Sequence, residues 1–222
     1  GFTLAAHVAI QYMNTVRPLT FQFSLVMADS GCDATTAATG AQTLIDAGVV
    51  GIAGAACSGA TMGAIDVAAA AGVPMVSYAS TSPAITNYDD DGYLFRVVPS
   101  DAQQGQALAD VFAASGYENP GVIAMTNDYG AGFHAAFLDN WDGDVCAEAT
   151  YADGTTDFSS HVSAVLDCDS VVMITYASDG AAIAEELAVQ GAEHQIFGGD
   201  GIADVGFASE FTDLWAMDGI TV

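Results

Sequence analysis

The sequence contains no lysine and only two arginines, Arg17 and Arg96, against 22 aspartates and 6 glutamates. The formal net charge of −26 would repel a phosphate-coated polymer, because nucleic-acid binding depends on clustered Lys and Arg. Without lysine the chain has no Walker A loop, no Schiff base and no pyridoxal anchor. We interpret the acidic excess as a hydrated surface that keeps the protein soluble by self-repulsion, and we predict no nucleic-acid partner.

Long apolar runs and catalytic motifs are also missing. No stretch of 18 uninterrupted apolar residues exists, which argues against a membrane span within the chain. Ser58 lacks the flanking glycines of a nucleophile elbow, and the glycines between residues 51 and 59 do not have the dinucleotide-binding spacing. The histidines have no metal-ligand spacing. The sequence therefore predicts no cofactor, no metal and no enzymatic activity.

The 222 residues, 52% of them hydrophobic, suit one large or two modest globular domains. The four cysteines form two well-separated pairs without CxxC spacing. Three connectivities are open, and four buried free thiols are the alternative. Pairing within each half, Cys32 with Cys57 and Cys146 with Cys168, would join neighbouring strand ends and imply an oxidising compartment.

Short apolar runs alternate with longer alanine-rich stretches. The apolar runs predicted as strands are Phe21–Ala28, Val49–Ala56, Pro74–Tyr78, Leu94–Val98, Val122–Thr126, Ser170–Tyr176 and Gln195–Gly198. The helix-like segments between them are Ala34–Ala47, Ala60–Ala71, Gln103–Ala114, Gly130–Asn140, Ser159–Leu166 and Gly180–Gln190. Glycines predicted to stop helices are Gly48, Gly72, Gly116 and Gly191. This order predicts an α/β fold with a mostly parallel sheet covered by helices on both faces.

Polar residues follow several of the predicted strands. Open parallel sheets bind ligands beyond the carboxyl ends of their strands, so these positions are candidate sites. Ser58 is the predicted N-cap of a helix whose free N–H groups could receive a carboxylate or phosphate. Residues 77–83 form a hydroxyl-rich turn that suits either a small polar ligand or a plain helix cap. Residues 127–130 and Asp200, between two glycines, follow two further strands.

Four segments carry a resemblance to a known family: GAACSGATMGAIDVAAAAGVPMVSYASTSPAIT, YLFRVVPSDAQQGQALAD, NDYGAGF and DGTTDFSS. In this order they resemble the periplasmic substrate-binding proteins of branched-chain amino acid ABC transporters, the leucine/isoleucine/valine-binding family with the type I periplasmic-binding fold. The resemblance implies two α/β lobes that close on a ligand about a hinge and perform no chemistry. It also supports the bridge between Cys32 and Cys57, whereas Cys146 and Cys168 are outside the family's pattern.

The resemblance also implies domain boundaries. The first lobe would comprise residues 1–98, a hinge crossover residues 99–101, and the second lobe residues 102–217. Residues 218–222 would begin the return to the first lobe. The chain opens at Gly1, at what resembles the family's first helix, so we expect the first strand and the C-terminal return of the first lobe to be missing from these residues. Such a lobe would leave sheet edges and apolar faces uncovered.

By the same resemblance, Ser58, Ala79 and Thr81 would hold the α-carboxylate and α-ammonium of an amino acid in the first lobe. Tyr129 and Asp200 would close over the amino group from the second lobe, with Asp200 as the counter-charge. The leucine-type members have Glu at that position, so this shorter acid is a departure from the pattern. Together these groups suit a zwitterion.

Tyr176 lies at the strand end that supplies an aromatic wall in the family, and a core tyrosine is the alternative. The predicted function is an extracytoplasmic binding protein, periplasmic or secreted. It would act as a monomer, capture a small, aliphatic or branched-chain amino acid, and deliver it to an ABC permease. The alternatives are a sensor domain of the same fold, or a binder of amides or urea. A transmembrane helix after Val222 would favour the sensor.

Overall fold

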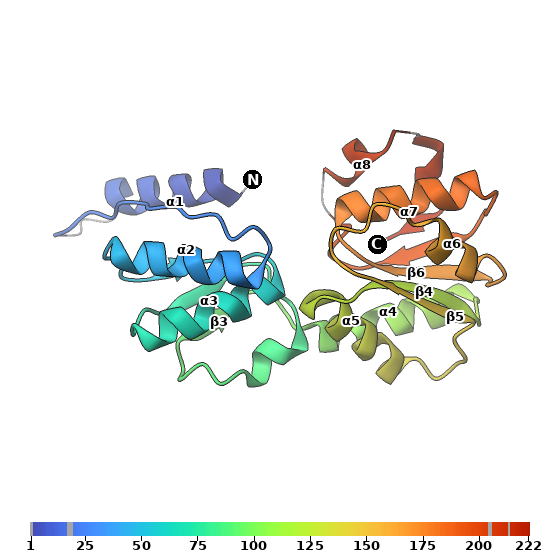
Figure 1. Cartoon of the computed structure of the whole chain (residues 1–222), viewed down its shortest axis with the longest axis horizontal. Coiled ribbons are helices and arrows are strands. Elements are labelled where there is room, and N and C mark those ends of the chain that lie inside the picture. Colours follow the sequence, from blue (N-terminus) through green and yellow to red (C-terminus); the bar gives the residue numbers. More distant parts are fainter. Residues whose placement is uncertain (1, 17–19, 204–205, 213) are drawn as a thin grey trace.

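The computed structural model describes residues 2–16, 20–203, 206–212 and 214–222, which form two α/β lobes side by side along the long axis of the molecule (Figure 1). The sheet of the first lobe is parallel, in the order β1-β2-β3. Its strands are β1 (Ile52–Ala53), β2 (Met75–Ser77) and β3 (Leu94–Arg96). The chain then passes to the second lobe, whose first helix begins at Asp101.

The sheet of the second lobe is also parallel, in the order β5-β4-β6-β7-β8. Its strands are β4 (Pro120–Met125), β5 (Ala147–Tyr151), β6 (Ser170–Ile174), β7 (Gln195–Gly198) and β8 (Ile220–Thr221). Both sheets therefore confirm the predicted fold class, α/β with parallel strands and flanking helices.

The helices cover the sheets unequally. In the first lobe they are α1 (Phe2–Val16), α2 (Ala34–Asp46), α3 (Ser58–Ala70) and the 3-10 helix η1 (Pro83–Asn87). In the second lobe, one face of the sheet carries α4 (Asp101–Ser115) and α5 (Asp128–Asn140) (Figure 1). The other face carries α6 (Ser159–Val165), α7 (Ala177–Val189), α8 (Phe207–Glu210) and the 3-10 helix η2 (Leu214–Met217). Within the described residues, no helix has the length and hydropathy needed to span a bilayer.

Two layers of core result in the second lobe, because successive strand residues point to opposite faces. Val122 and Ala124 of β4 pack with the aromatic core under α4 and α5, whereas Ile123 and Met125 pack under α6 and α7. Every residue of β4 and β6 is buried, which is why both strands read as uninterrupted apolar runs. The glycines predicted to stop helices all have positive φ.

The first lobe departs from the prediction of helices on both faces. Met75 and Leu94 are buried in the core shared with α2 and α3. Val76, Phe95 and Val97, which alternate with them, are 38%, 55% and 73% exposed. In the described structure, the sheet of the first lobe is therefore covered on one face only.

The predicted strand Phe21–Ala28 is wrong, because residues 22–30 form neither a helix nor a strand. A strand needs a partner for its backbone groups, and apolar composition alone does not supply one. The side chain of Asn14 takes that role at one position, bonding both Phe23 N and Phe23 O at 2.8 Å. The prediction also omitted β5 and β8. Ile220 and Thr221 pair with β7, which corrects the expectation that residues 218–222 begin the return to the first lobe.

Both cysteine pairs form disulfides as predicted. The Cys32–Cys57 bridge, with Cα atoms 5.3 Å apart, ties the loop before α2 to the N-cap of α3. The Cys146–Cys168 bridge, with Cα atoms 5.6 Å apart, joins the residues just before β5 and β6. It passes over Gly121 of β4, where an added Cβ would lie 3.1 Å from Cys168 Sγ.

Candidate ligand-binding site

The topology of the second sheet has a switch point at the carboxyl end of β4. The chain leaves β4 toward β5 on one side and later crosses to β6 on the other, and such switch points hold ligands beyond the carboxyl ends of the strands. Tyr129, in the first turn of α5, and Tyr176, the N-cap of α7, meet at this point. Their rings stack with centroids 5.0 Å apart and planes 12° apart. Tyr129 is buried and Tyr176 is partly exposed, so the stack can form a wall.

Asp200, which follows β7, joins the same cluster. The Tyr129 hydroxyl donates a hydrogen bond to Asp200 Oδ1 at 2.9 Å and accepts one from Gly201 N at 3.1 Å. Burial, followed by the charge of Asp200, raises the pKa of Tyr129 well above its usual value, so the phenol keeps its proton. Three of the residues predicted for the site, Tyr129, Tyr176 and Asp200, are therefore brought together by the fold.

Two residues of this cluster, Asp101 and Gln104, were not predicted to contact ligand. Gln104 Nε2 donates to Asp101 Oδ1 at 2.6 Å and to Asp200 Oδ1 at 2.9 Å. Gln104 Oε1 accepts from Asp200 N at 2.7 Å. One amide thus holds two carboxylates that are 99 positions apart in the sequence. The available signal was that Asp101 and Gln104 are two polar residues one turn apart at the start of a helix. The sequence analysis assigned Asp101 only to the hinge crossover.

Asp101 connects this cluster to the first lobe. Its backbone N donates to Thr81 O at 2.8 Å, and its side chain has no exposed surface. Burial raises the pKa of Asp101 to about 6; the charge of Asp200 acts in the same direction, and the Thr81 and Gln104 side chains and the Arg96 charge oppose it. Asp101 is therefore a carboxyl group that titrates near neutral pH at the junction of the lobes.

The first-lobe residues predicted for the site lie around the same junction. The N-cap of α3 is Cys57, not Ser58, which is the first residue of the helix. The hydroxyl of Ser58 is buried and accepts a hydrogen bond from Ser82 N at 3.2 Å, so it supports the turn at 77–83. The Thr81 residue is 5% exposed, and its hydroxyl group lies near the Asp101 carboxyl group, whose pKa it lowers. Ala79 is partly buried, and its N lies 3.4 Å from Ser77 Oγ.

Buried hydroxyl groups make this turn rigid. Thr61 Oγ1 and Ser80 Oγ are 2.7 Å apart, and Ser77 Oγ donates to Ala55 O at 2.7 Å. These bonds join the ends of β1 and β2 to the first turns of α3. A ligand group placed here meets a preformed surface, which reduces the entropy cost of binding.

Arg96 at the end of β3 holds the same turn from the other side. Its Nη1 donates to the carbonyl oxygens of residues 80, 81 and 82 at 3.4, 3.1 and 2.9 Å, and its Nη2 donates to Thr86 Oγ1 at 2.6 Å. Sequence reasoning gave Arg96 no role. Because its donors are used within the first lobe, we assign Arg96 to positioning the turn.

The two lobes also touch where α3 faces α5. A Cβ added at Gly59 would lie 2.8 Å from Asp128 Oδ2, so this carboxylate lies against the first turn of α3. A Cβ added at Gly132 would lie 2.8 Å from Pro83 Cδ, so α5 also approaches η1 closely. Asn127, the N-cap of α5, donates from Nδ2 to Asp153 Oδ1 at 2.9 Å.

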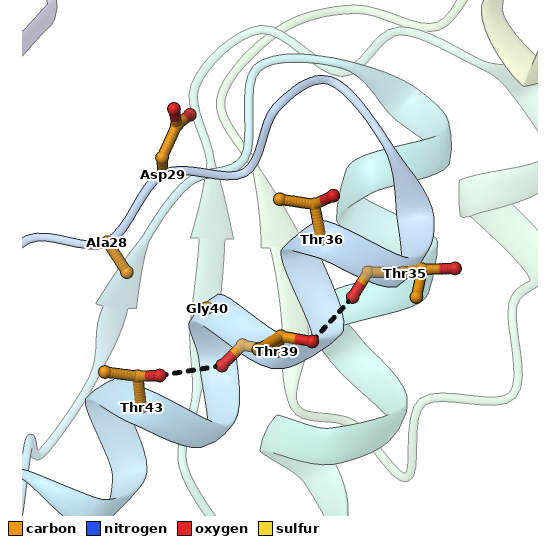
Figure 2. Close-up of a pocket in the computed structure, with 7 residues that line it drawn as sticks. All are labelled: Ala28, Asp29, Thr35, Thr36, Thr39, Gly40 and Thr43. Carbon is orange, nitrogen blue, oxygen red and sulfur yellow. Dashed lines mark hydrogen bonds between the residues drawn. The ribbon is translucent and has the colours of Figure 1, made fainter.

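A separate cavity of about 390 Å³ lies beside α2, between that helix and residues 28–29 (Figure 2). Threonines line it, but Thr39 Oγ1 donates to Thr35 O at 3.0 Å and Thr43 Oγ1 donates to Thr39 O at 2.9 Å. None of the predicted ligand-binding residues lines it. We therefore assign the candidate site to the junction of the lobes. Within the described residues, no group of three or more His, Cys, Asp or Glu side chains could hold a metal ion.

Two parallel sheets whose polar strand ends meet across a short crossover define a two-lobed ligand-binding protein. Residues 2–202 match the family model described as receptor family ligand binding region, and the chain belongs to this family. The family model describes a ligand binding region, and the solved structures that resemble this chain include substrate-binding proteins of transporters.

Solved structures confirm the resemblance to branched-chain amino acid binding proteins. The substrate-binding protein LivJ of Streptococcus pneumoniae, in complex with isoleucine, has a TM-score of 0.85 and 26% identity over 95% of this chain and 62% of its own. The leucine-binding protein LivK of Thermotoga maritima has a TM-score of 0.83 and 27% identity, over 92% of this chain and 61% of its own.

Receptors are similar over a shorter region. Metabotropic glutamate receptor 4 of Macaca fascicularis is 33% identical over 100 residues, 44% of this chain and 11% of the receptor. The chain therefore spans about three fifths of the two binding proteins and about a tenth of the receptor.

Proposed function

We propose that the protein captures an α-amino acid between its lobes and delivers it to an ABC permease. The observation that carries this proposal is the hydrogen-bonded series from Thr81 through Asp101 and Gln104 to Asp200 and Tyr129. It joins polar groups of both lobes around two carboxylates, which is the chemistry that recognises an ammonium group. The α-carboxylate would be held by the N–H groups in the first turn of α3 and in the turn at 77–83.

The ligand contacts in this proposal are those predicted from sequence, Ser58, Ala79, Thr81, Tyr129, Tyr176 and Asp200, with Asp101 added. Ser58 would act through the helix start, since its hydroxyl already accepts from Ser82. Tyr176 would act as the aromatic wall. LivJ, in complex with isoleucine, and LivK, a leucine-binding protein, support an aliphatic amino acid as the first class to test. Amides and urea are the alternative ligand class.

The proposal also covers the closure of the lobes, the oligomeric state and the location of the protein. The lobes would close about residues 99–101, between the end of β3 and the start of α4, with the first lobe ending near residue 98. The protein would act as a monomer. Two disulfides support a periplasmic or extracellular location, because such bridges persist in oxidising compartments.

A thermal-shift panel tests the function. Each natural amino acid, several amides and urea would be added at millimolar concentration to the full chain. A ligand at 100 times its dissociation constant adds about 2.7 kcal/mol of stability, which moves the midpoint by several degrees. A selective shift by α-amino acids is the expected result. A shift by amides alone would contradict the assigned zwitterion site.

A second candidate function is a sensor of the same fold, in which ligand occupancy is passed to an attached signalling domain. The similarity to metabotropic glutamate receptors favours it. Direct binding to a permease distinguishes the two functions. Ligand-dependent association with permease-containing membranes is expected for transport, and its absence despite amino-acid binding would favour the sensor.

A further inference from the structure

The turn at residues 199–201, which presents Asp200 at the end of β7, is held by two side chains. Gln104 Oε1 accepts a hydrogen bond from Asp200 N at 2.7 Å, and the Tyr129 hydroxyl accepts one from Gly201 N at 3.1 Å. The same two side chains donate to Asp200 Oδ1, each at 2.9 Å. These four hydrogen bonds fix both the backbone and the carboxylate of Asp200.

The glycines on either side of Asp200 let the turn lie directly on these side chains. A Cβ added at Gly199 would lie 2.9 Å from Gln104 Oε1, and one added at Gly201 would lie 2.6 Å from the Tyr129 hydroxyl oxygen. Neither position therefore has room for a larger residue. Because both side-chain bonds end on Oδ1, Oδ2 of this exposed aspartate is the oxygen left for a ligand ammonium.

The Gln104 amide satisfies its partners in one orientation. The backbone N–H of Asp200 can only donate, so Oε1 of the amide faces it and Nε2 faces the carboxylates. The two N–H groups of Nε2 then serve Asp101 Oδ1 at 2.6 Å and Asp200 Oδ1 at 2.9 Å. Both N–H groups and the carbonyl oxygen of the amide are thus in use.

Gln104 supplies these donors without adding a positive charge. Arg96, the other strong donor near the junction, directs its hydrogen bonds to the turn at 80–82 and to Thr86 within the first lobe. A lysine or arginine in place of Gln104 would neutralise the two carboxylates and repel a ligand ammonium. A neutral amide holds the acids in place and leaves their negative charge for the ligand.

We propose that Gln104 is a positioning residue for ligand binding. It fixes Asp200 with one carboxylate oxygen available to the ligand ammonium, and its neutral amide preserves the charge of Asp101 and Asp200 for that ammonium. Gln104 acts on the ligand only through these two acids. The inference rests on the proposed function, because it concerns the acids assigned there to the amino group.

Gln104→Met removes the amide and keeps a side chain of similar length. Titration calorimetry of the full chain with L-leucine and with L-alanine measures its effect on binding. We expect the affinity for both to fall by the same factor, roughly tenfold, because the α-ammonium is common to both amino acids.

Gln103→Met is the matched control, because Gln103 is the neighbouring, exposed glutamine of the same helix. It should change either affinity by less than about twofold. A loss in Gln104→Met no larger than in Gln103→Met would overturn the inference.

A double-mutant cycle tests whether Gln104 acts through Asp200. In an Asp200→Ala background the carboxylate that Gln104 holds is gone, so adding Gln104→Met should cost only about twofold in affinity. A further loss of the full factor seen in the natural background would contradict the inference, since the effect of Gln104 would then be independent of Asp200.

Gln104→Lys separates the role of charge from a structural role, and it needs no measurable binding by Asp200→Ala. A lysine ammonium can donate to both acids, so the midpoint of thermal unfolding should equal or exceed that of the natural protein. The affinity for both amino acids should nevertheless fall further than in Gln104→Met, because the new charge repels the ligand ammonium. A purely structural role predicts that affinity follows stability, and natural affinity in Gln104→Lys would refute the inference.

The outcomes separate the inference from the proposed function. Binding of either amino acid with the same affinity in the natural protein and in Gln104→Met would overturn the inference and leave the proposed function standing. Binding of neither amino acid by the natural protein would contradict the proposed aliphatic ligand, and the inference with it.

Discussion

Replacing Asp101 by asparagine tests whether a buried carboxyl group at the junction of the lobes lowers stability at neutral pH. Burial raises its pKa from 3.8 to about 6 in the folded protein, with Asp200 adding to the shift and Thr81, Gln104 and Arg96 opposing it. The folded state therefore binds this proton more tightly than the unfolded state. At about 1.4 kcal/mol per pKa unit, the shift corresponds to roughly 3 kcal/mol.

The sign follows from that difference in proton affinity. The stabilisation from protonated Asp101 is fully present below pH 3.8 and is lost as the pH rises through about 6. An asparagine cannot ionise, so the Asp101→Asn variant does not lose this stabilisation. Its free energy of unfolding, relative to that of the natural protein, should therefore increase by up to about 3 kcal/mol between pH 4 and pH 7.5. The other acids titrate in both proteins and cancel in the difference.

Urea denaturation at several pH values and constant ionic strength measures this difference. Asp142→Asn, which removes an exposed acid outside the site, is the control for the loss of one negative charge. A difference for Asp101→Asn that stays constant with pH would refute the reasoning, since it would mean that Asp101 is ionised normally in the folded protein.

The same group links binding to pH. A ligand ammonium next to Asp101 favours the ionised carboxylate, so it lowers the pKa of this group. Binding at pH 6 should then release a proton, and affinity should fall as the pH drops from about 6 toward 5. Calorimetry in two buffers of different ionisation enthalpy measures the proton release, and equal heats in both buffers would contradict it.

Three further substitutions test separate parts of the structure. Asp200→Asn should weaken amino-acid binding by about 1.5–3 kcal/mol, the loss of a charge-assisted hydrogen bond, and unchanged affinity in calorimetry would contradict its role. Ser58→Ala should cost binding only about 1 kcal/mol, because the N–H groups of α3 remain; a loss as large as for Asp200→Asn would assign the main contact to the hydroxyl. Arg96→Met should lower the free energy of unfolding in urea by about 2 kcal/mol, because carbonyl oxygens of the turn at 80–82 lose their donor, and an unchanged midpoint would show that water replaces it.

The alternation of apolar runs and helices was sufficient to predict an α/β fold with parallel strands, because buried parallel strands leave an uninterrupted apolar pattern, as in β4 and β6. The division into two lobes was implied by the family resemblance. The same signal was wrong at Phe21–Ala28, whose composition suits a strand but which has no pairing partner in the described structure. It also omitted β5, where exposed and buried residues mix. Periodicity reports burial, and pairing depends on segments elsewhere in the chain.

The candidate site was predicted in part for a similar reason. Tyr129, Tyr176 and Asp200 follow strands, and the carboxyl ends of parallel strands meet at one edge of a sheet, so their meeting follows from the fold class. Gln104 does not follow a strand, and a polar residue in the first turn of a helix does not by itself indicate a contact with a strand end. Its amide became important only because α4 packs beside the end of β7 and brings it to Asp200.

By itself the sequence determined the α/β class, the helix stops at glycine and the lack of lysine chemistry, because each depends on local composition or spacing. Only the tertiary structure decided which acids share a site. Asp101 and Asp200 are far apart in the chain, and their contact through Gln104 depends on the order of strands and the docking of α4. Electrostatic coupling depends on distance in space, and spacing along the chain does not encode that distance.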